Sequence, residues 1–182
     1  LCLFGIGESA MEAQLREQML QMENPTLAPY AKEGSTELRI TAKAATQEAC
    51  QALIAPVEAK LRAIFGDLIY GADVKDLAQA AGNLLLEHKV TLATAESCTG
   101  GMIAARLTDL PGISAVFKGG VVCYTNEVKH SALGVPNEML EEYGAVSPEV
   151  CAALAQGARE KLGADLGLSV TGVAGPDPDD RG

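Results

Sequence analysis

The sequence predicts an α/β protein made of two units, a small α+β unit over residues 1–72 and a layered α/β unit over residues 76–182. Short apolar runs typical of strands alternate with stretches in which apolar residues recur at helical spacing. Apolar residues make up 48% of the 182 positions, so each unit can bury a core. Residues 73–75 mark the boundary between the two patterns.

The first unit begins with a strand-like run at residues 1–6. Ser9 and Glu12 have the spacing of a capping box, which predicts that a helix starts there. Residues 24–35 read NPTLAPYAKEGS and are rich in turn-forming residues. They are therefore expected to form a connection without regular structure.

The rest of the first unit predicts a strand, a helix and a final short strand. Residues 37–42 alternate between polar and apolar, as in a strand with one buried face. One apolar stripe runs along residues 46–65, and Pro56 within it is expected to kink or divide the helix. A short strand is expected at residues 68–70. This order is compatible with a small KH-like or ferredoxin-like unit.

The second unit alternates between helices and apolar strands, which predicts helices layered on a sheet. Its most distinct helix begins at Ser147-Pro148-Glu149, with Ser147 as the cap, and stops at Gly163. The expected elements are a helix from residue 76, a strand at 90–95, a helix at 101–107, a strand at 117–124, and then helices at 128–133 and 148–162 and a strand at 166–170.

The charge and the sequence of the first unit argue against a nucleic-acid or membrane partner. The net charge is −10, whereas nucleic acids and anionic membranes require a basic surface. No Gly-x-x-Gly clamp is present in the KH-like unit. A small anionic molecule stays possible, because backbone N–H groups bind anions without any net positive charge.

The five cysteines indicate neither a disulfide framework nor a zinc site, because their number is odd and no CxxC spacing occurs. Reduced thiols of this kind are typical of a cytoplasmic protein. The sequence has no signal peptide and no apolar run long enough to span a bilayer. The chain begins with Leu1 and stops soon after a strand-and-turn signal, so it is interpreted as a piece of a longer protein.

The first candidate for chemistry is TAESCTGG at residues 94–101, where a strand gives way to a helix. Ligands of α/β sheets bind beyond the carboxyl ends of strands, and glycines there allow close approach to the backbone. Ser97 is then a candidate nucleophile, and Cys98 is its rival, because a helix N-terminus stabilises a thiolate. In the alternative interpretation Thr99 only caps the helix and Ser97 only shapes the turn.

Tyr124 and Lys129 form the second candidate cluster, at the end of the next strand. If a turn and the start of a helix separate them, both side-chain tips can reach one site. A lysine held near apolar groups loses part of its preference for the charged form and can then deprotonate a serine. The alternative is a solvated surface lysine. His88 and His130 have no identifiable carboxylate partner and do not suggest a triad.

The third cluster is SVTGVAGPD at residues 169–177, again a strand followed by glycine-rich backbone. By itself this stretch would be a turn and nothing more. The three clusters in this order, together with GAVSPEV at residues 144–150, closely resemble the C-terminal domain of the CinA family of competence/damage-inducible proteins. LFGIGES, NPTLAPYAKEGSTELRITAKA and LIYG resemble the KH-like middle domain of that family.

The resemblance implies a three-layer α/β/α domain, incomplete here, similar to the nicotinamide-nucleotide amidohydrolase PncC. It implies hydrolysis of the carboxamide of nicotinamide mononucleotide to nicotinic acid mononucleotide and ammonia. On this view Ser97 attacks the amide and forms an acyl-enzyme, while Lys129 together with Tyr124 moves the proton. No cofactor or metal is required.

The resemblance also assigns the substrate contacts. N–H groups around Thr99, Gly100 and Gly101 would hold an anion, either the tetrahedral oxygen or the ribose phosphate. Asn126, Thr171 and Gly172 would line the same site. The resemblance also implies that the protein forms a homodimer.

The longer family members carry a further domain, linked to metal-dependent ADP-ribose pyrophosphatase activity, that this sequence does not contain. The alternative function is a non-catalytic nucleotide-binding or interaction module of a competence or DNA-damage system.

Overall fold

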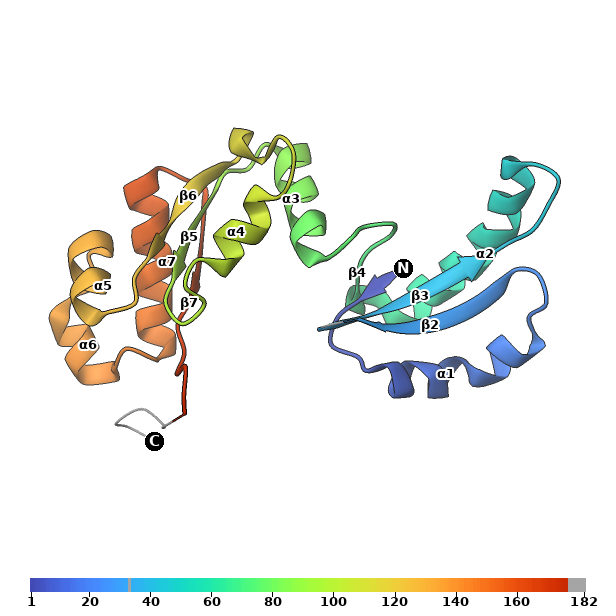
Figure 1. Ribbon diagram of the computed structural model, residues 1–182, viewed down its shortest axis with the longest axis horizontal. Coiled ribbons are helices and arrows are strands. Elements are labelled where there is room, and N and C mark those ends of the chain that lie inside the picture. The colour runs from blue at the N-terminus through green and yellow to red at the C-terminus, as the bar shows by residue number, and fades with distance from the viewer. Residues whose placement is uncertain (33, 177–182) are drawn as a thin grey trace. The chain divides into compact units, whose positions relative to one another are not determined.

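The computed structural model describes residues 1–32 and 34–176 and divides into two compact units, Leu1–Ala80 and Ala81–Gly182. Each unit has its own sheet and is described separately (Figure 1). The predicted combination of an α+β unit and an α/β unit is confirmed, since one sheet is antiparallel and the other is parallel.

The first unit packs two helices against one face of an antiparallel sheet with strand order β2-β3-β1-β4. Its core is formed by apolar residues of the sheet and of both helices, namely Leu3, Met11, Leu15, Leu27, Leu38, Leu61 and Phe65. The elements are β1 (Cys2–Leu3), α1 (Glu8–Gln21), β2 (Thr26–Lys32), β3 (Ser35–Thr41), α2 (Gln47–Phe65), η1 (Gly66–Leu68) and β4 (Ile69–Gly71).

The structure corrects the expected connection at residues 24–35. Most of this stretch is β2, which pairs with β3 along its whole length from Thr26 to Lys32. The turn-forming Pro29 is tolerated because β2 lies at the edge of the sheet, where a missing N–H need not interrupt the ladder. Pairing with β3 therefore overrides the local turn signals.

One prediction about the helices of the first unit is wrong, and the expected division of the second helix at Pro56 is not observed. Helix α1 starts at Glu8 behind Gly7, which supplies no side-chain cap, so Ser9 lies inside the first turn and the capping box does not form. Helix α2 runs unbroken through Pro56, because it is capped by Thr46 at its start and anchored by buried residues after the proline. The first strand is also shorter than expected, with only Cys2–Leu3 paired.

The second unit is built on a parallel sheet with strand order β6-β5-β7, in which β5 is central. The predicted start of α7 is confirmed: the Ser147 hydroxyl accepts the Val150 N–H, and Gly163 ends the helix. The remaining elements of the chain are α3 (Leu77–His88), β5 (Leu92–Glu96), α4 (Met102–Thr108), η2 (Ile113–Ala115), β6 (Phe117–Val122), α5 (Asn126–Leu133), α6 (Asn137–Tyr143), α7 (Pro148–Leu162) and β7 (Leu166–Val170).

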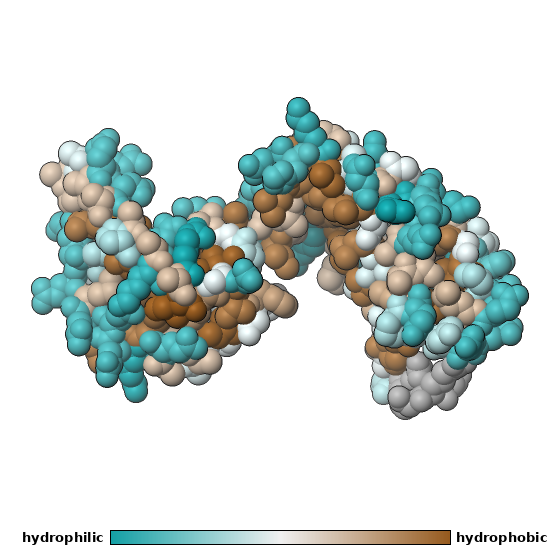
Figure 2. Space-filling model, turned by 180° about the vertical axis from the view of Figure 1, so that it is seen from behind, coloured by the Kyte–Doolittle hydropathy of each residue, from teal (hydrophilic) through white to brown (hydrophobic). Residues whose placement is uncertain are grey.

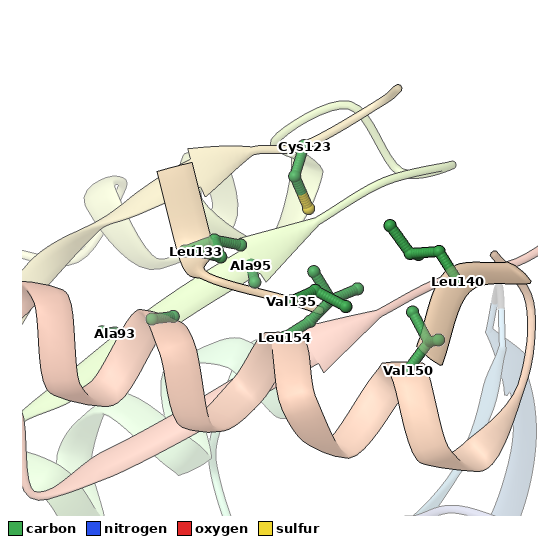
Figure 3. Packing of buried hydrophobic residues seen from close by; sticks show 9 residues of the cluster. Ala93, Ala95, Cys123, Leu133, Val135, Leu140, Val150 and Leu154 are labelled. Atoms are coloured by element: carbon green, nitrogen blue, oxygen red, sulfur yellow. The ribbon is translucent and has the colours of Figure 1, made fainter. Parts of the chain in front are cut away.

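Helices cover both faces of this sheet, so the second unit has three layers (Figure 1). On one face α5, α6 and α7 pack over Ala93 and Ala95 of β5, in the cluster drawn in Figure 3. On the other face Leu92 packs with residues of α3, α4 and the segment between α4 and β6. Strand β5 is buried along its whole length and is the central strand of the sheet.

Apolar side chains also reach the surface of each unit (Figure 2). In the second unit, Leu166 and Leu168 of the edge strand β7 are 49% and 42% exposed. Among the helices that the structure describes, none combines the length and the apolar character needed to cross a membrane.

Candidate active site at the carboxyl edge of the parallel sheet

The three strands of the second unit end in register. The last residue of β5, Glu96, lies opposite Val122 of β6 and Val170 of β7. Each of the three sequence clusters begins within two residues of one of these strand ends. Because parallel strands present their carboxyl ends at one edge of the sheet, the topology brings the three clusters together.

Ser97 and Lys129, predicted from separate clusters, are in contact. The Lys129 Nζ lies 3.2 Å from the Ser97 Oγ. Both residues are almost fully buried, with 2% and 5% of their surface exposed. The interpretation of Lys129 as a solvated surface residue is therefore wrong.

The hydrogen-bond partners that the structure describes for the Lys129 amine are all uncharged. Besides Ser97 Oγ, it contacts the carbonyl oxygens of Cys123 at 3.0 Å and Tyr124 at 3.3 Å. Lys129 forms no salt bridge with any residue in the described part of the chain. A buried amine without a carboxylate partner costs stability, so its retention at this position needs a reason other than packing.

Helix α5 places the lysine. The Thr125 side chain caps the helix by accepting the Val128 N–H, and the Thr125 carbonyl accepts the Lys129 N–H at 3.0 Å. The helix ends at Gly134, which has the left-handed conformation that suits glycine. Lys129 thus sits in the first turn of a short helix capped at both ends, and its side chain reaches back to the end of β6.

Cys123 links the site to the core. Its carbonyl accepts from Lys129, while its thiol lies in the apolar cluster under the sheet (Figure 3). Burial raises the pKa of the Cys123 thiol, and the positive charge of Lys129 offsets part of that rise. Cys123 therefore serves as a packed, protonated anchor for the segment between β6 and α5.

The turn that carries Ser97 requires glycine. Gly100 and Gly101 have φ values of 61° and 98°, which side chains disfavour. The Ser97 N–H donates to the Val170 carbonyl at 2.9 Å, and the Gly100 N–H donates to the Ser97 carbonyl at 3.0 Å. Ser97 is thus held between the end of β7 and its own turn.

Some donors of this turn are free. The N–H groups of Cys98, Thr99 and Gly101 have no hydrogen-bond partner among residues 1–32 and 34–176. The buried Thr99 hydroxyl also has none, so it does not cap helix α4 as the alternative interpretation required. The N–H of Gly100, in contrast, is already used within the turn.

The third cluster closes the site from the side of β7. An added Cβ at Gly172 would lie 3.0 Å from the Cys98 Sγ, so this glycine packs directly against the residue after Ser97. The Thr171 hydroxyl donates to the Ala145 carbonyl at 2.7 Å and thereby ties the segment to the loop before α7. Gly172 therefore lies beside Cys98, the residue after Ser97, whereas the Thr171 hydroxyl bonds the Ala145 carbonyl.

Two expected site residues lie at the surface. Tyr124 is 61% exposed, and it contacts Lys129 through its carbonyl oxygen rather than its phenol. Asn126, the first residue of α5, is also exposed. His130 bonds the Val135 carbonyl at 2.8 Å, and His88 lies at the exposed end of α3.

One buried residue of the site was missed in the sequence. Glu96 is 1% exposed and accepts the N–H groups of Ile103 at 2.9 Å and Ala104 at 2.8 Å. The signal that could have found it is a carboxylate at the end of an otherwise apolar strand, immediately before the candidate nucleophile. In the described part of the chain, no group of three or more His, Cys, Asp or Glu side chains could hold a metal ion.

Both units match known protein families. The family model described as the CinA C-terminal domain matches residues 74–182, and the model of the damage-inducible protein CinA KH domain matches residues 1–71. A CinA-like protein of Dictyoglomus turgidum is 49% identical over 173 residues, which are 95% of this chain and 42% of that protein. The chain thus spans about two fifths of the length of this relative.

Solved structures agree with these matches. The competence/damage inducible protein CihA from Agrobacterium tumefaciens is 40% identical, with a TM-score of 0.55 over 60% of this chain and 67% of that one. A competence-damaged protein (CinA) superfamily protein from Escherichia coli is 35% identical, with a TM-score of 0.58 over 63% and 68% of the two chains. Because the two family models together cover almost every residue, the chain belongs to the CinA family, with a CinA KH domain followed by a CinA C-terminal domain.

Proposed function

We propose that the second unit is an amidohydrolase that converts nicotinamide mononucleotide and water to nicotinic acid mononucleotide and ammonia. The observation that carries this proposal is the buried contact of 3.2 Å between the Lys129 amine and the Ser97 hydroxyl. A nucleophile within hydrogen-bond reach of its base is the arrangement that covalent acyl transfer needs. The choice of substrate rests on the family resemblance.

The geometry around Lys129 suits a base. The carbonyl oxygens of Cys123 and Tyr124 can only accept, so they take two N–H bonds of the amine. In the neutral form those are its only N–H bonds, and the remaining lone pair faces the Ser97 hydroxyl. In the charged form the third N–H donates to Ser97. The same three contacts therefore fit the amine before and after it takes a proton.

In the first half of the reaction Ser97 Oγ attacks the carboxamide carbon while Lys129 takes the hydroxyl proton. The amide oxygen becomes negatively charged, and the free N–H groups of the turn, from Cys98, Thr99 and Gly101, are available to stabilise it. Lys129 then gives its proton to the departing nitrogen. Ammonia leaves, and Ser97 carries an ester of the pyridine acid.

In the second half a water molecule gives its proton to Lys129 and attacks the ester carbon. The tetrahedral oxygen meets the same N–H groups. Lys129 returns the proton to Ser97 Oγ, the carbon–oxygen bond to serine breaks, and nicotinic acid mononucleotide is released. The enzyme is restored, so one water is consumed for each ammonia produced.

Incubation of the chain with nicotinamide mononucleotide, with ammonia release as the readout, tests the proposal. The Ser97→Ala variant is expected to lose activity by on the order of 10³-fold or more. The matched Cys98→Ala variant, which removes the rival nucleophile on the next residue, is expected to keep most of it. Activity that survives in Ser97→Ala and disappears in Cys98→Ala would assign the reaction to the thiol instead.

A second candidate is a nucleotide-binding module without catalysis. The exposed Tyr124 favours it, because Tyr124 bonds Lys129 through its carbonyl oxygen and the phenol forms no hydrogen bond with the amine. This candidate predicts that pyridine nucleotides raise the melting temperature of the chain while no ammonia is released. Turnover abolished by Ser97→Ala would exclude it.

A further inference from the structure

The Glu96 side chain connects the two ends of the turn that carries Ser97. Glu96 is the last residue of β5 and precedes the candidate nucleophile directly. Its two carboxylate oxygens accept separate N–H groups from the first turn of α4, those of Ile103 and Ala104. One side chain therefore ties the strand before the turn to the helix after it.

Among residues 1–32 and 34–176, no other side chain caps the start of α4. The residue at the start of α4 is Gly101, which has no side chain to cap the helix. The Thr99 hydroxyl is buried without a hydrogen-bond partner in the described part of the chain. The carboxylate of Glu96 thus replaces a local cap and closes the five-residue turn from Ser97 to Gly101.

The backbone of Glu96 extends this connection to the lysine. Its carbonyl accepts the Cys123 N–H at 2.8 Å, and the Cys123 carbonyl in turn accepts from the Lys129 amine at 3.0 Å. Glu96 consequently contacts the segments that carry both members of the Ser97–Lys129 pair. A shift of about 1 Å between such groups is enough to slow a reaction substantially.

We infer that Glu96 is a positioning residue for Ser97, an inference that rests on the proposed function. Its carboxylate holds the turn so that the Ser97 hydroxyl stays within reach of Lys129 and the free N–H groups stay fixed beside it. The carboxylate also occupies the N–H groups of Ile103 and Ala104, which makes the start of α4 unavailable to an anionic group of the substrate. The donors left for a developing oxyanion are those of the turn itself.

The test is the Glu96→Gln variant of the full chain, which keeps the shape but places an NH₂ group opposite one of the two N–H donors. Hydrogen exchange of backbone amides, followed by NMR, reports on the turn without any need for turnover. We expect exchange to accelerate at least tenfold at Ile103 and Ala104, and at Ser97 and Gly100, the two residues of the turn whose N–H groups are hydrogen-bonded. In the ammonia assay we expect kcat to fall about 10- to 100-fold while KM changes less than threefold.

Glu96→Asp and Asp76→Asn serve as comparisons. Glu96→Asp keeps the charge on a shorter side chain, so its kcat should lie between those of the wild type and Glu96→Gln. If Glu96→Gln does not fold, the exchange rates and kcat of Glu96→Asp test the inference in its place. The Asp76 carboxylate also caps a helix, by accepting the Gln79 N–H at 2.9 Å, but it is not linked to Ser97. Asp76→Asn should therefore leave kcat unchanged.

Unchanged exchange in the turn of Glu96→Gln would overturn the inference, and so would faster exchange with an unaltered kcat. A fall in kcat of equal size in Asp76→Asn would reduce Glu96 to a general contributor to stability and would also overturn it. If the wild type releases no ammonia, the proposed function fails, and the exchange data still decide whether Glu96 holds the turn.

Discussion

Lys129 buries an amine whose hydrogen-bond partners are a hydroxyl and two carbonyls. Structural lysines usually keep the amine in water or pair it with a carboxylate, because desolvating the charge is costly. Ser97 has little reason to be buried beside it unless the two act together. At the scale of residues, the catalytic proposal therefore explains a contact that stability alone would disfavour.

Replacing Lys129 with Met separates the effect of the amine on stability from its effect on catalysis. Met removes the cost of burying the amine, which stabilises the fold, but it leaves the carbonyls of Cys123 and Tyr124 without that donor, which destabilises it. Each of these two contributions is about 1–3 kcal/mol, so they nearly cancel. We expect the free energy of unfolding to change by less than about 2 kcal/mol, while ammonia release falls by on the order of 10²-fold or more. Urea denaturation and the ammonia assay measure the two effects; an active Lys129→Met enzyme would contradict the assigned role.

At the scale of elements, the site depends on how closely helices α5 and α7 approach each other. Gly157 of α7 is buried, and a Cβ added there would lie 2.2 Å from the carbonyl oxygen of Leu133, the last residue of α5. Helix α5 carries Lys129 in its first turn. The close packing of α5 against Gly157 therefore also fixes the distance between the lysine and the sheet.

Gly157→Ala is expected to destabilise the chain although alanine favours helices. The propensity gain is about 1 kcal/mol, but the methyl group would meet backbone that cannot rotate away, and overpacking costs about 1–3 kcal/mol. Gly82→Ala in α3 is the matched control, since its Cβ would meet the flexible end of Leu110. Urea denaturation should show Gly157→Ala to be at least about 1 kcal/mol less stable than Gly82→Ala; equal stabilities would contradict the close approach.

A reciprocal contact joins the starts of β5 and β7. The Asp165 carboxylate accepts the N–H of Thr91 at 2.9 Å and its hydroxyl at 2.6 Å, and the Thr91 hydroxyl accepts the Asp165 N–H. These hydrogen bonds lower the pKa of Asp165 below its ordinary value of 3.8. A lowered folded-state pKa means that the contribution to stability is complete above about pH 4 and is lost as the pH falls further.

The Asp165→Asn variant should therefore melt at a lower temperature than the wild type near neutral pH, and the difference should shrink below about pH 4. Melting temperatures measured by circular dichroism across this range test the prediction. Asp109→Asn removes an exposed carboxylate of the same unit that has no hydrogen-bond partner in the described part of the chain. A difference between wild type and Asp165→Asn that stays constant with pH would contradict the pKa argument.

At the scale of the whole molecule, the chain is strongly acidic. The chain contains a CinA KH domain, and its net charge is −10. In the first unit, Lys32 and Arg39 are both paired with Glu37, which reduces the positive charge they present. We therefore propose that the KH domain of this chain does not serve as a nucleic-acid module.

The corresponding prediction is an absence of tight nucleic-acid binding. Electrostatic contacts with phosphates supply most non-specific affinity, and an acidic chain lacks them. In a gel-shift assay at low salt, neither duplex DNA nor single-stranded RNA should be retarded at micromolar concentrations of the chain. Retardation that disappears as salt is raised would contradict the prediction and would point to a local basic surface.

Much of this structure could be predicted from sequence because local signals and tertiary packing agree. The Ser147 cap, the stop at Gly163 and the glycine-rich turn after β5 all appear where the residues suggested. The convergence of the clusters also follows from sequence, since parallel strands present their ends at one edge. Whether Tyr124 assists Lys129 through its phenol stays a prediction.

The features that could not be predicted from the sequence depend on contacts between residues that are far apart along the chain. Residues 26–32 become an edge strand because they pair with β3, and Pro29 can join because an edge strand does not need every N–H for pairing. Helix α2 continues through Pro56 because packing around Leu61 and Phe65 outweighs the local cost. At these positions local propensity favours a different structure from the one observed, and tertiary contacts override that preference.

The sequence by itself determined the α/β class, the family and the three clusters at strand ends, since apolar periodicity and turn chemistry are local properties. Only the tertiary structure decided that the Lys129 amine meets Ser97 among uncharged acceptors and that Glu96 holds the intervening turn. The physical reason is distance along the chain. The Lys129–Ser97 contact spans 32 residues, and its geometry depends on the register of the sheet and on the packing of α5 against α7.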